Sequence, residues 1–349
     1  MAQWRFGFRN GRSVFLEQSG TNSNYGSING TTWTLTDGHA GNLRQALSLA
    51  VALGHESARN WLLAPRAPWR WAAPRRVPGA SAAFGRGFAT ALRQEPPALA
   101  IGCGRQAALA TRLAREAGAK AVQILDPRID PAHWDLVIAP EHDGLSGANV
   151  LTPLGSLNPV DEGWLAAGRA DFPQLAMLPR PRIALLLGGS SPHARFDRAA
   201  FDEMAETVSG VLADGGSVLA TASRRTDPEV SAALRARMDA GNGDGWVGVA
   251  WTGEGDGPNP YPGLLGWADR IVCTPDSVNM ISEACATWAP VFVFDPKGTR
   301  GRPRRFLDAL LARGRIRPLD ASLAPFEAEP LRETARIAAQ VRERLSASG

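Results

Sequence analysis

The sequence predicts an α/β protein built from two doubly wound domains that face a cleft. Its 349 residues are too many for one ordinary core and enough for two. Short apolar stretches alternate with amphipathic segments along the chain, and glycine-rich or polar turns follow several of them. This alternation is typical of parallel sheets covered by helices on both faces. We therefore expect the functional residues in loops beyond the carboxyl ends of the strands.

The first half of the chain predicts one domain, which we place at residues 31–165. TTWTLT is expected to form a strand, DGHAGN a glycine-rich turn, and LRQALSLAVALG a helix that ends at Gly54. The same order recurs in ALAIGCG and RQAALATRLAREAG, and the strands AVQILD and DLVIAP follow. Residues 1–30 are rich in Gly, Asn and Ser without a sustained period, so we expect a poorly ordered extension there.

The second half repeats the pattern, which predicts a second domain at residues 166–325 and a terminal helix at 326–349. The proline-containing segment between residues 158 and 182 is expected to connect the two domains. RIALLLGGSS predicts a strand that enters a glycine turn, and SVLATAS predicts another strand. Farther on, the apolar stretches IVC and VFVF flank the segment TPDSVNMISEACATWAP, which predicts a loop and a short helix between two strands.

The composition argues against several classes of protein. Of the 38 basic residues, 36 are arginines; they are scattered, with one denser run at 300–305, so we expect no nucleic-acid partner. No apolar stretch of about 18 residues is present, so no membrane-spanning helix is expected. The N-terminal MAQWRFGFRN lacks an apolar signal core, which favours a cytoplasmic location. The three cysteines lack metal-ligand spacing and are expected to be buried thiols.

The turn LLLGGSS is the strongest candidate for binding a phosphate. Gly188 and Gly189 allow a tight turn and a close approach of the backbone to a ligand. Ser190 and Ser191 add hydroxyl groups, and backbone N–H groups at such a turn suit an anion. A tight turn that needs glycine and contacts no ligand is the alternative interpretation.

The segment TPDSVNMISEA adds a second set of candidates. Asp276 and Ser277 are placed to cap a helix that begins near Val278. Glu283 lies about one and two-thirds turns farther along that helix, away from its apolar stripe. A carboxylate there suits a vicinal diol, because it can accept two hydroxyl protons. One helix would then hold a phosphate at its positive end and a ribose along its side.

These two motifs resemble the donor domain of GT-B fold glycosyltransferases, such as the lipid II-forming N-acetylglucosaminyl transferase. The resemblance rests on the GGS turn after the first strand of the second half and on ADRIVCTPDSVNMISEACATWAPVFVF. It implies two Rossmann-like domains, with the acceptor side at 31–165 and the nucleotide-sugar side at 166–325. It also implies that Glu283 binds the nucleotide ribose.

A closer resemblance covers nearly the whole chain from Thr34 onward. TLTDGHAGNLRQALSLA, IGCGRQAALA, VQILDPRID, DLVIAPEHDGLSGANVL, RPRIALLLGGSS, NPYPGLLGWADRIVCTPDSVNMISEA and RGRPRRFLDALLARGRIRP occur in this order. They resemble the mitochondrial fission "elongated mitochondria" family. This resemblance implies either an adaptor that recruits dynamin-related proteins, as in plants, or nucleotide-sugar chemistry, as suspected for bacterial members.

Further candidates follow from the needs of a sugar transfer. Arg224 follows the strand SVLATAS, and it or Arg225 would neutralise a diphosphate leaving group, although both also suit a solvated surface. An acceptor must lose a proton, and we name Asp37 in TDGHAGN and Asp143 in PEHDGL as candidate catalytic bases. His39 is a weaker choice, because related sequences often carry Lys or Arg at this position.

A dinucleotide site is the competing interpretation of the first half. Gly102-x-Gly104-x-x-Ala107 follows a strand, and Asp126 ends the next strand about twenty residues on. This pattern would make the protein an NAD-dependent epimerase or dehydrogenase. Pro127 restricts how Asp126 is presented, and the chain has no Tyr-x-x-x-Lys pair, so we rank this interpretation lower.

The sequence thus favours a metal-independent, GT-B-like glycosyltransferase, with a non-catalytic adaptor as the main alternative. We expect a nucleotide-sugar co-substrate, no further cofactor, and a glycan or lipid-linked acceptor in cell-envelope synthesis. No Asp-x-Asp suited to a divalent ion follows a strand. APWRWAAPRR, with Trp69 and Trp71, suits peripheral contact with the inner membrane, although burial explains these tryptophans equally well.

Overall fold

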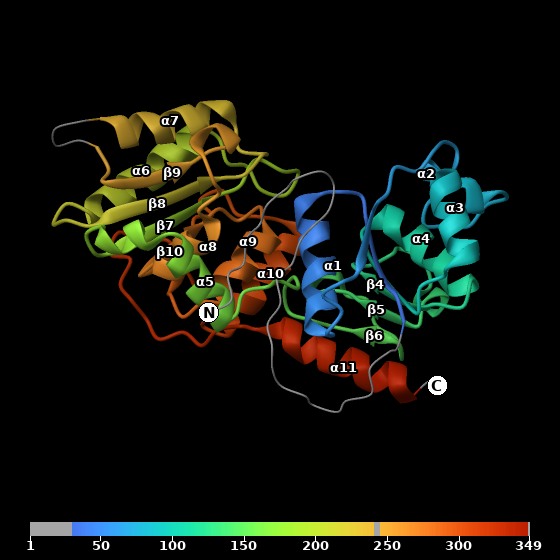
Figure 1. Cartoon of the computed structure of the whole chain (residues 1–349). Helices are drawn as coiled ribbons and strands as arrows, with labels where there is room; N and C mark the ends of the chain where they lie inside the picture. The colour runs from blue at the N-terminus through green and yellow to red at the C-terminus, as the bar shows by residue number, and fades with distance from the viewer. Residues whose placement is uncertain (1–29, 241–244, 348–349) are drawn as a thin grey trace. The chain divides into compact units, whose positions relative to one another are not determined.

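The chain has the expected α/β fold, with two six-stranded sheets in which every strand pair is parallel (Figure 1). This computed structural model describes residues 30–240 and 245–347. The chain divides into two compact units: unit 1 runs up to Pro159 and resumes at Glu333, and unit 2 is Val160–Arg332. Except for Gly30, the N-terminal extension expected at 1–30 lies outside the described residues.

Unit 1 contains a sheet with the strand order β2-β1-β3-β4-β5-β6. Its strands are β1 Thr32–Thr36, β2 Arg59–Leu62, β3 Leu99–Cys103, β4 Lys120–Ile124, β5 Leu136–Ile138 and β6 Val150–Leu151. Its helices are α1 Ala40–Ala52, α2 Trp69–Ala72, α3 Gly85–Gln94, α4 Arg105–Glu116 and α11 Glu333–Ala347, with short 3-10 turns at Ala80–Ala82, Pro131–His133 and Glu141–Asp143.

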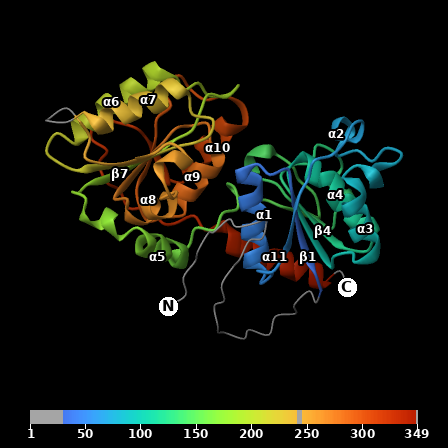
Figure 2. The same cartoon turned by 45° about the horizontal axis from the view of Figure 1, so that its top comes forward.

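Helices cover both faces of the unit 1 sheet. On one face, α1 and the C-terminal α11 pack on apolar residues of β3 and β4, such as Ile101 and Val122 (Figures 1 and 2). On the other face, α3 and α4 pack on Trp33 and Leu35 of β1. Because both faces are buried, β3 and β5 are apolar along their length, and the threonines that alternate with Trp33 and Leu35 in β1 are buried as well. The helix at the end of the sequence is therefore part of the first unit's core.

Unit 2 contains a sheet with the strand order β12-β11-β10-β7-β8-β9. Its strands are β7 Arg182–Leu187, β8 Ser217–Ala222, β9 Gly248–Trp251, β10 Arg270–Cys273, β11 Val291–Val293 and β12 Ile316–Pro318. Its helices are α5 Glu162–Asp171, α6 Arg198–Val211, α7 Pro228–Asp239, α8 Tyr261–Trp267, α9 Val278–Cys285 and α10 Gly301–Ala312, with 3-10 turns at Pro173–Met177 and Glu254–Asp256.

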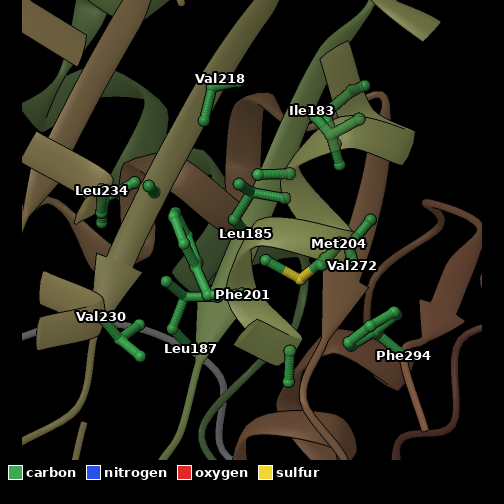
Figure 3. Packing of buried hydrophobic residues seen from close by; sticks show 14 of the residues in the cluster. Ile183, Leu185, Leu187, Phe201, Met204, Val218, Val230, Leu234, Val272 and Phe294 are labelled. Atoms are coloured by element: carbon green, nitrogen blue, oxygen red, sulfur yellow. The ribbon is translucent and has the colours of Figure 1, made fainter. Parts of the chain in front are cut away.

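The core of unit 2 follows the two-residue repeat of its central strand. Ile183, Leu185 and Leu187 of β7 point to one face, where Phe201 and Met204 of α6 cover them (Figure 3). Val218 of β8 and Val230 and Leu234 of α7 complete this layer. The alternate residues of β7 are also buried, so this strand is enclosed on both faces. The position of the loops after β7 is therefore fixed by a well-packed strand.

The segment expected to connect two domains belongs mostly to unit 2. Within it, α5 packs closely on α8: a Cβ on Gly168 would lie 2.5 Å from the backbone of Pro262, and one on Gly263 would lie 2.8 Å from Phe172. Glycines permit this close helix approach. The first unit consequently ends at Pro159 rather than at residue 165.

Among the helices of residues 30–240 and 245–347, none is both long enough and apolar enough to span a bilayer.

Candidate functional site

The strand order of unit 2 creates one position where neighbouring strands connect in opposite directions. β7 and β10 pair directly, but the chain continues from β7 to β8 on one side and from β10 to β11 on the other. Ligands of doubly wound sheets bind at such a switch point, outside the carboxyl ends of the strands. The two loops that leave β7 and β10 here are 188–191 and 274–277. The structure therefore brings together the two motifs that the sequence singled out.

Asp276 occupies the glycine corner after β7. The Gly189 N–H donates to its Oδ2 at 3.0 Å, and the Thr274 hydroxyl donates to its Oδ1 at 2.7 Å. The Thr274 hydroxyl oxygen in turn accepts from the Gly188 N–H at 2.8 Å. A Cβ on Gly188 would lie 2.0 Å from the carboxylate, and one on Gly189 would lie 1.9 Å from the Arg225 carbonyl oxygen. These two glycines are thus required by close internal packing, and both of their amides already have acceptors.

Asp276 does not cap α9, contrary to our expectation from the sequence. Ser277 is the N-cap residue, and its hydroxyl accepts from the Met280 N–H at 3.4 Å. The Asp276 side chain is fully buried and forms an ion pair with Arg225 at 2.9 Å, while the Arg225 side chain is 55% exposed. Adjacent Arg224 is exposed and forms no ion pair with any described residue. Arg225, rather than Arg224, is the arginine coupled to the glycine corner.

The hydroxyls of Ser190 and Ser191 stabilise the loop that follows. Ser190 Oγ accepts from the Phe196 N–H at 3.1 Å and donates to the Phe196 carbonyl oxygen at 3.0 Å. Ser191 Oγ accepts from the N–H groups of His193 and Ala194 at 3.2 and 3.1 Å. Ser190 itself is exposed at the end of β7. Both serines therefore have a structural role in the turn.

Glu283 is buried, with only 1% of its surface exposed. Its Oε2 accepts from the hydroxyl of Tyr261, the first residue of α8, at 2.5 Å. We expected this carboxylate to lie away from the apolar side of the helix, and the structure instead encloses it between α9 and α8. A ribose would reach Glu283 only if the residues around it moved.

A basic rim surrounds the switch point. The loop after β11 lies against the loop after β7, because the Arg300 N–H donates to the His193 carbonyl oxygen at 3.0 Å. Arg195 and Lys297 both pair with Asp197, at 2.8 and 3.3 Å. The exposed Arg300 side chain forms no ion pair with the described residues. Cations thus outnumber acids along this edge, which favours an anionic ligand.

A hollow of about 270 Å³ in unit 2 lies elsewhere, beside the ends of β11 and β12. It is lined by Phe294, Leu307 and Pro318, among others, together with Arg304, whose guanidinium pairs with Asp295 at 3.4 Å. None of the site residues predicted from the sequence lines it. The strand order identifies the switch point as the stronger candidate, because ligands of doubly wound sheets bind where the loops after two neighbouring strands diverge.

Asp37 lies at the corresponding switch point of unit 1, where β1 pairs with β3. Its Oδ1 accepts from Asn42 Nδ2 at 3.0 Å and from the His39 N–H at 3.1 Å, and His39 Nδ1 lies 3.0 Å away. Burial raises the pKa of Asp37, but these hydrogen bonds from Asn42 and His39 outweigh it and leave the pKa below its ordinary value. A carboxylate stabilised in this way is a weak general base.

The environment of Asp143 shifts its pKa in the opposite direction to that of Asp37. Asp143 lies in the 3-10 turn after β5, and burial raises its pKa above the ordinary value. The charges of His142 and Arg128 lower this pKa, whereas the nearby charge of Asp126 raises it further. A raised pKa makes this carboxylate a stronger base than one whose pKa is lowered.

Asp37 and Asp143 do not form one catalytic pair. They follow β1 and β5, which are separated by β3 and β4 in the sheet. With strands about 4.8 Å apart, the two loop ends are roughly 14 Å apart. At most one of them can therefore act on a given acceptor hydroxyl.

The glycines of the possible dinucleotide motif are explained by packing. A Cβ on Gly102 would lie 2.5 Å from the Thr111 side chain of α4, and one on Gly104 would lie 2.7 Å from Asn42 Nδ2. Asp126, at the end of β4, pairs with Arg128 at 3.2 Å. Asn42 thus already occupies the space beside Gly104 that a pyrophosphate would need to enter.

Sequence reasoning missed Thr274 and Tyr261, which hold Asp276 and Glu283 respectively. The only signal was position: Thr274 directly follows the apolar strand β10, and Tyr261 is the first residue of α8 after a proline-containing loop. Among residues 30–240 and 245–347, no group of three or more His, Cys, Asp or Glu side chains is arranged to hold a metal ion.

Comparisons with known proteins place this geometry in context. A UDP-GlcNAc 2-epimerase from Methanocaldococcus jannaschii has a TM-score of 0.52 and 11% identity, covering 90% of this chain and 99% of that one. This likeness supports the GT-B-like fold class and shows the fold alone. A glycosyltransferase of kitacinnamycin has a TM-score of 0.47 and 15% identity, covering 91% and 93%. Because this TM-score is below 0.5, we base no conclusion on this second likeness.

The sequence comparison is more specific. The chain is 30% identical over 287 residues to the mitochondrial fission protein ELM1 of Arabidopsis thaliana. The match covers 73% of this chain and 66% of the plant protein, so about a third of the plant protein lies outside it. A sequence profile described as Mitochondrial fission ELM1 matches residues 40–345. The chain therefore belongs to the mitochondrial fission ELM1 family, as its seven ordered motifs indicated.

Proposed function

We propose that unit 2 binds a nucleotide-sugar at the β7–β10 switch point and that the protein is a metal-independent glycosyltransferase. The main support is the convergence there of the exposed loop end at Ser190, the N-terminus of α9 and the Arg224–Arg225 pair. The epimerase that shares the fold is named for UDP-GlcNAc, which makes a UDP-sugar the first donor to test. The acceptor would be a glycan or a lipid-linked sugar, and the protein would act in the cytoplasm.

The buried carboxylate changes how the diphosphate would be held. Asp276 occupies the glycine corner, so the phosphates would lie in front of it, against Arg225. Only Nη2 of this guanidinium contacts Asp276, and a guanidinium has five N–H donors. Asp276 and Arg225 together are close to neutral, so the net attraction would come from Arg224 and from the positive end of α9. Asp276 would act by orienting Arg225.

The transfer step would then rest on stabilising the leaving group. The acceptor oxygen would bond to the anomeric carbon while the bond from that carbon to the diphosphate oxygen breaks. The diphosphate would leave with its negative charge stabilised by the arginines. The acceptor proton would go to a carboxylate, and of the two candidates named from the sequence Asp143 has the raised pKa and Asp37 the lowered one.

Isothermal titration of the full chain with UDP, UDP-N-acetylglucosamine and GDP-mannose tests the donor site. We expect Arg224→Ala and Arg225→Ala each to weaken binding about tenfold, because each removes a charge-assisted contact. Arg313→Ala is the matched control, since Arg313 is an exposed arginine after α10 and should leave the affinity unchanged. An equal loss in all three variants would contradict a site at the switch point.

An adaptor without catalytic activity is the second candidate. It is favoured by the burial of Glu283 against Tyr261 and by the occupied amides of the glycine corner. The named role of the Arabidopsis relative in mitochondrial fission points the same way. Absence of heat across the whole nucleotide panel, with a folded protein, would favour the adaptor. Adding NADH to the panel tests the dinucleotide alternative in the same experiment.

A further inference from the structure

One segment of unit 1 carries basic residues without any acid. Residues 57–94 contain seven arginines and neither Asp nor Glu, whereas the whole chain has a net charge of +4. The remainder of the chain therefore has a net charge of −3, from +4 minus +7. This segment comprises β2, α2, α3 and the loops between them, and we call it the basic segment.

The charges of the basic segment are exposed and largely unpaired. Only Arg76 forms an ion pair, with Glu116 of α4 at 3.1 Å. The other six make no ion pair with any described residue. All seven side chains are exposed: Arg59, Arg66, Arg70, Arg75, Arg76, Arg86 and Arg93. Since other arginines of the chain pair with acids at close range, this concentration of uncompensated charge indicates an anionic partner.

The basic segment also contains two exposed large apolar side chains. Leu62, at the end of the edge strand β2, is 68% exposed, and Trp71 of α2 is 65% exposed. Arg70 lies over the Trp71 ring at 5.7 Å. Trp69 differs, because it is half-buried and donates its Nε1–H to the Pro78 carbonyl oxygen at 3.0 Å. Of the two tryptophans that the sequence suggested for membrane contact, Trp71 is therefore the exposed one.

The short helix α2, which carries Trp71, is held by hydrogen bonds from α4, which lies beside α2 and α3 (Figures 1 and 2). Arg105 donates to the carbonyl oxygens of Trp71 and Ala73, both at 2.6 Å. Gln106 donates to the Arg70 carbonyl oxygen at 3.1 Å, and Arg112 to that of Pro74 at 2.8 Å. An exposed tryptophan on a fixed backbone keeps its apolar surface in water, which favours a partner that covers it.

We propose that the basic segment is a docking surface for an anionic lipid bilayer. Trp71 and Leu62 insert into the headgroup region, and the surrounding arginines contact lipid phosphates. Exposed tryptophan beside unpaired basic residues is the combination that binds an anionic membrane interface, whereas a nucleic-acid surface would not need the exposed leucine. This surface is independent of the proposed nucleotide-sugar site, because it lies entirely within unit 1.

Co-sedimentation of the full chain with lipid vesicles tests the proposal. We expect binding to vesicles of phosphatidylcholine mixed with phosphatidylglycerol, and at least tenfold weaker binding to phosphatidylcholine alone. Binding should also fall as salt rises, because exposed charges are screened. Equal binding to both vesicle types, binding to neither, or tighter binding to a DNA or RNA duplex than to the anionic vesicles would overturn the proposal.

Matched variants distinguish binding through the basic segment from non-specific binding to vesicles. Trp71→Ala should weaken vesicle binding about tenfold, from the lost apolar burial. Arg70→Ala and Arg75→Ala should each weaken it about fivefold. The controls Trp288→Ala, which removes a tryptophan that is 61% exposed in unit 2, and Arg313→Ala should leave binding unchanged. Circular dichroism confirms folding, and losses as large in the controls as in the basic segment would overturn the assignment.

Discussion

At the scale of single residues, the buried carboxylate of Asp276 organises the candidate donor site. It accepts from Gly189 and Thr274 and pairs with Arg225. We expect Asp276→Ala to lower the free energy of unfolding by about 2–4 kcal/mol, because the buried Gly189 and Thr274 donors and the half-exposed Arg225 lose their acceptor. Asp276→Asn should cost less, since its amide oxygen still accepts one of these bonds. Urea unfolding of the full chain measures both.

Replacing Gly188 tests the packing of this corner, and replacing Gly210 of α6 serves as the matched control. Gly188→Ala places a Cβ 2.0 Å from the Asp276 carboxylate, so it should destabilise the protein. Gly210→Ala, in α6, places a Cβ with no atom within 4 Å and should stabilise the helix by about 0.5–1 kcal/mol. Equal effects of the two substitutions would show that Asp276 does not occupy the corner.

At neutral pH the ionised carboxylate of Asp37 should stabilise the folded protein, whereas that of Asp143 should destabilise it. The pKa of Asp37 is lowered in the folded protein, so its contribution is present above its unfolded value of 3.8 and is lost as the pH falls through the folded pKa. Asp37→Asn should therefore destabilise the protein at pH 7 and flatten the acid side of its stability profile. The measurement is the free energy of unfolding between pH 7 and acid pH.

The pKa of Asp143 is raised, so ionising it disfavours the folded state as the pH rises through the folded pKa. Asp143→Asn should stabilise the protein at pH 7, and its difference from wild type should disappear below the unfolded value of 3.8. A loss of stability at pH 7 would show that hydrogen bonds of this carboxylate outweigh its burial.

The sequence predicted the residue types of the site better than their partners. The glycine turn and the Ser277 cap depend on neighbours in sequence, so local patterns suffice to find them. Arg225 meets Asp276 only because β8, β7 and β10 are neighbours in the sheet. Sequence periodicity predicts strands but not their order, so this contact could not be predicted from it.

At the scale of elements, α9 is held at both ends. Ser277 caps its N-terminus, and buried Arg315 donates to carbonyl oxygens in its C-terminal turn and just beyond it. These acceptors include Cys285 at 3.0 Å and Thr287 at 2.8 Å. Burial lowers the pKa of Arg315, and its cationic donors satisfy carbonyls at the negative end of the helix. This clamp fixes the helix that carries Glu283.

Arg315→Ala should therefore lower the free energy of unfolding by about 3 kcal/mol or more, because several buried carbonyls lose their donor. Arg315→Lys should recover only part of this loss, since an ammonium group lacks the planar fork. Arg313→Ala, two residues earlier and exposed, should change stability by less than about 0.5 kcal/mol. Thermal unfolding followed by circular dichroism distinguishes the three variants.

The elements that sequence patterns missed include the helices α2 and α3 and two short strands at sheet edges. β2 has the sequence RNWL with no fully buried residue, and β12 buries only Ile316. Edge strands have one unpaired side and need no continuous apolar run, so neither gives the signal that identified β3 or β7. The central strands, which position the candidate sites, were the predictable ones.

At the scale of the whole chain, its last helix completes the first unit. α11 is amphipathic, and its apolar positions are Ile337, Ala338, Val341 and Leu345, all buried in the core with α1 and β3. Its first turn is tied to the same unit, since Glu333 accepts from the Gly155 N–H at 3.1 Å. Helical periodicity predicted this helix, but the sequence did not show which sheet it covers.

Removal of α11 should consequently unfold unit 1 and leave unit 2 intact. Burial of Ile337, Val341 and Leu345 contributes about 5 kcal/mol or more, which is comparable to the net stability of a typical domain. A chain that ends at Arg332 should therefore lose protease resistance before Pro159 while Val160–Arg332 stays protected, as mass spectrometry of the fragments would show. Val341→Asp should have the same effect in the full chain, because it buries an unpaired charge. Ala339→Asp, on the exposed side of α11, should have none. Equal resistance of both units without α11 would mean that the first sheet is stable without its last covering helix.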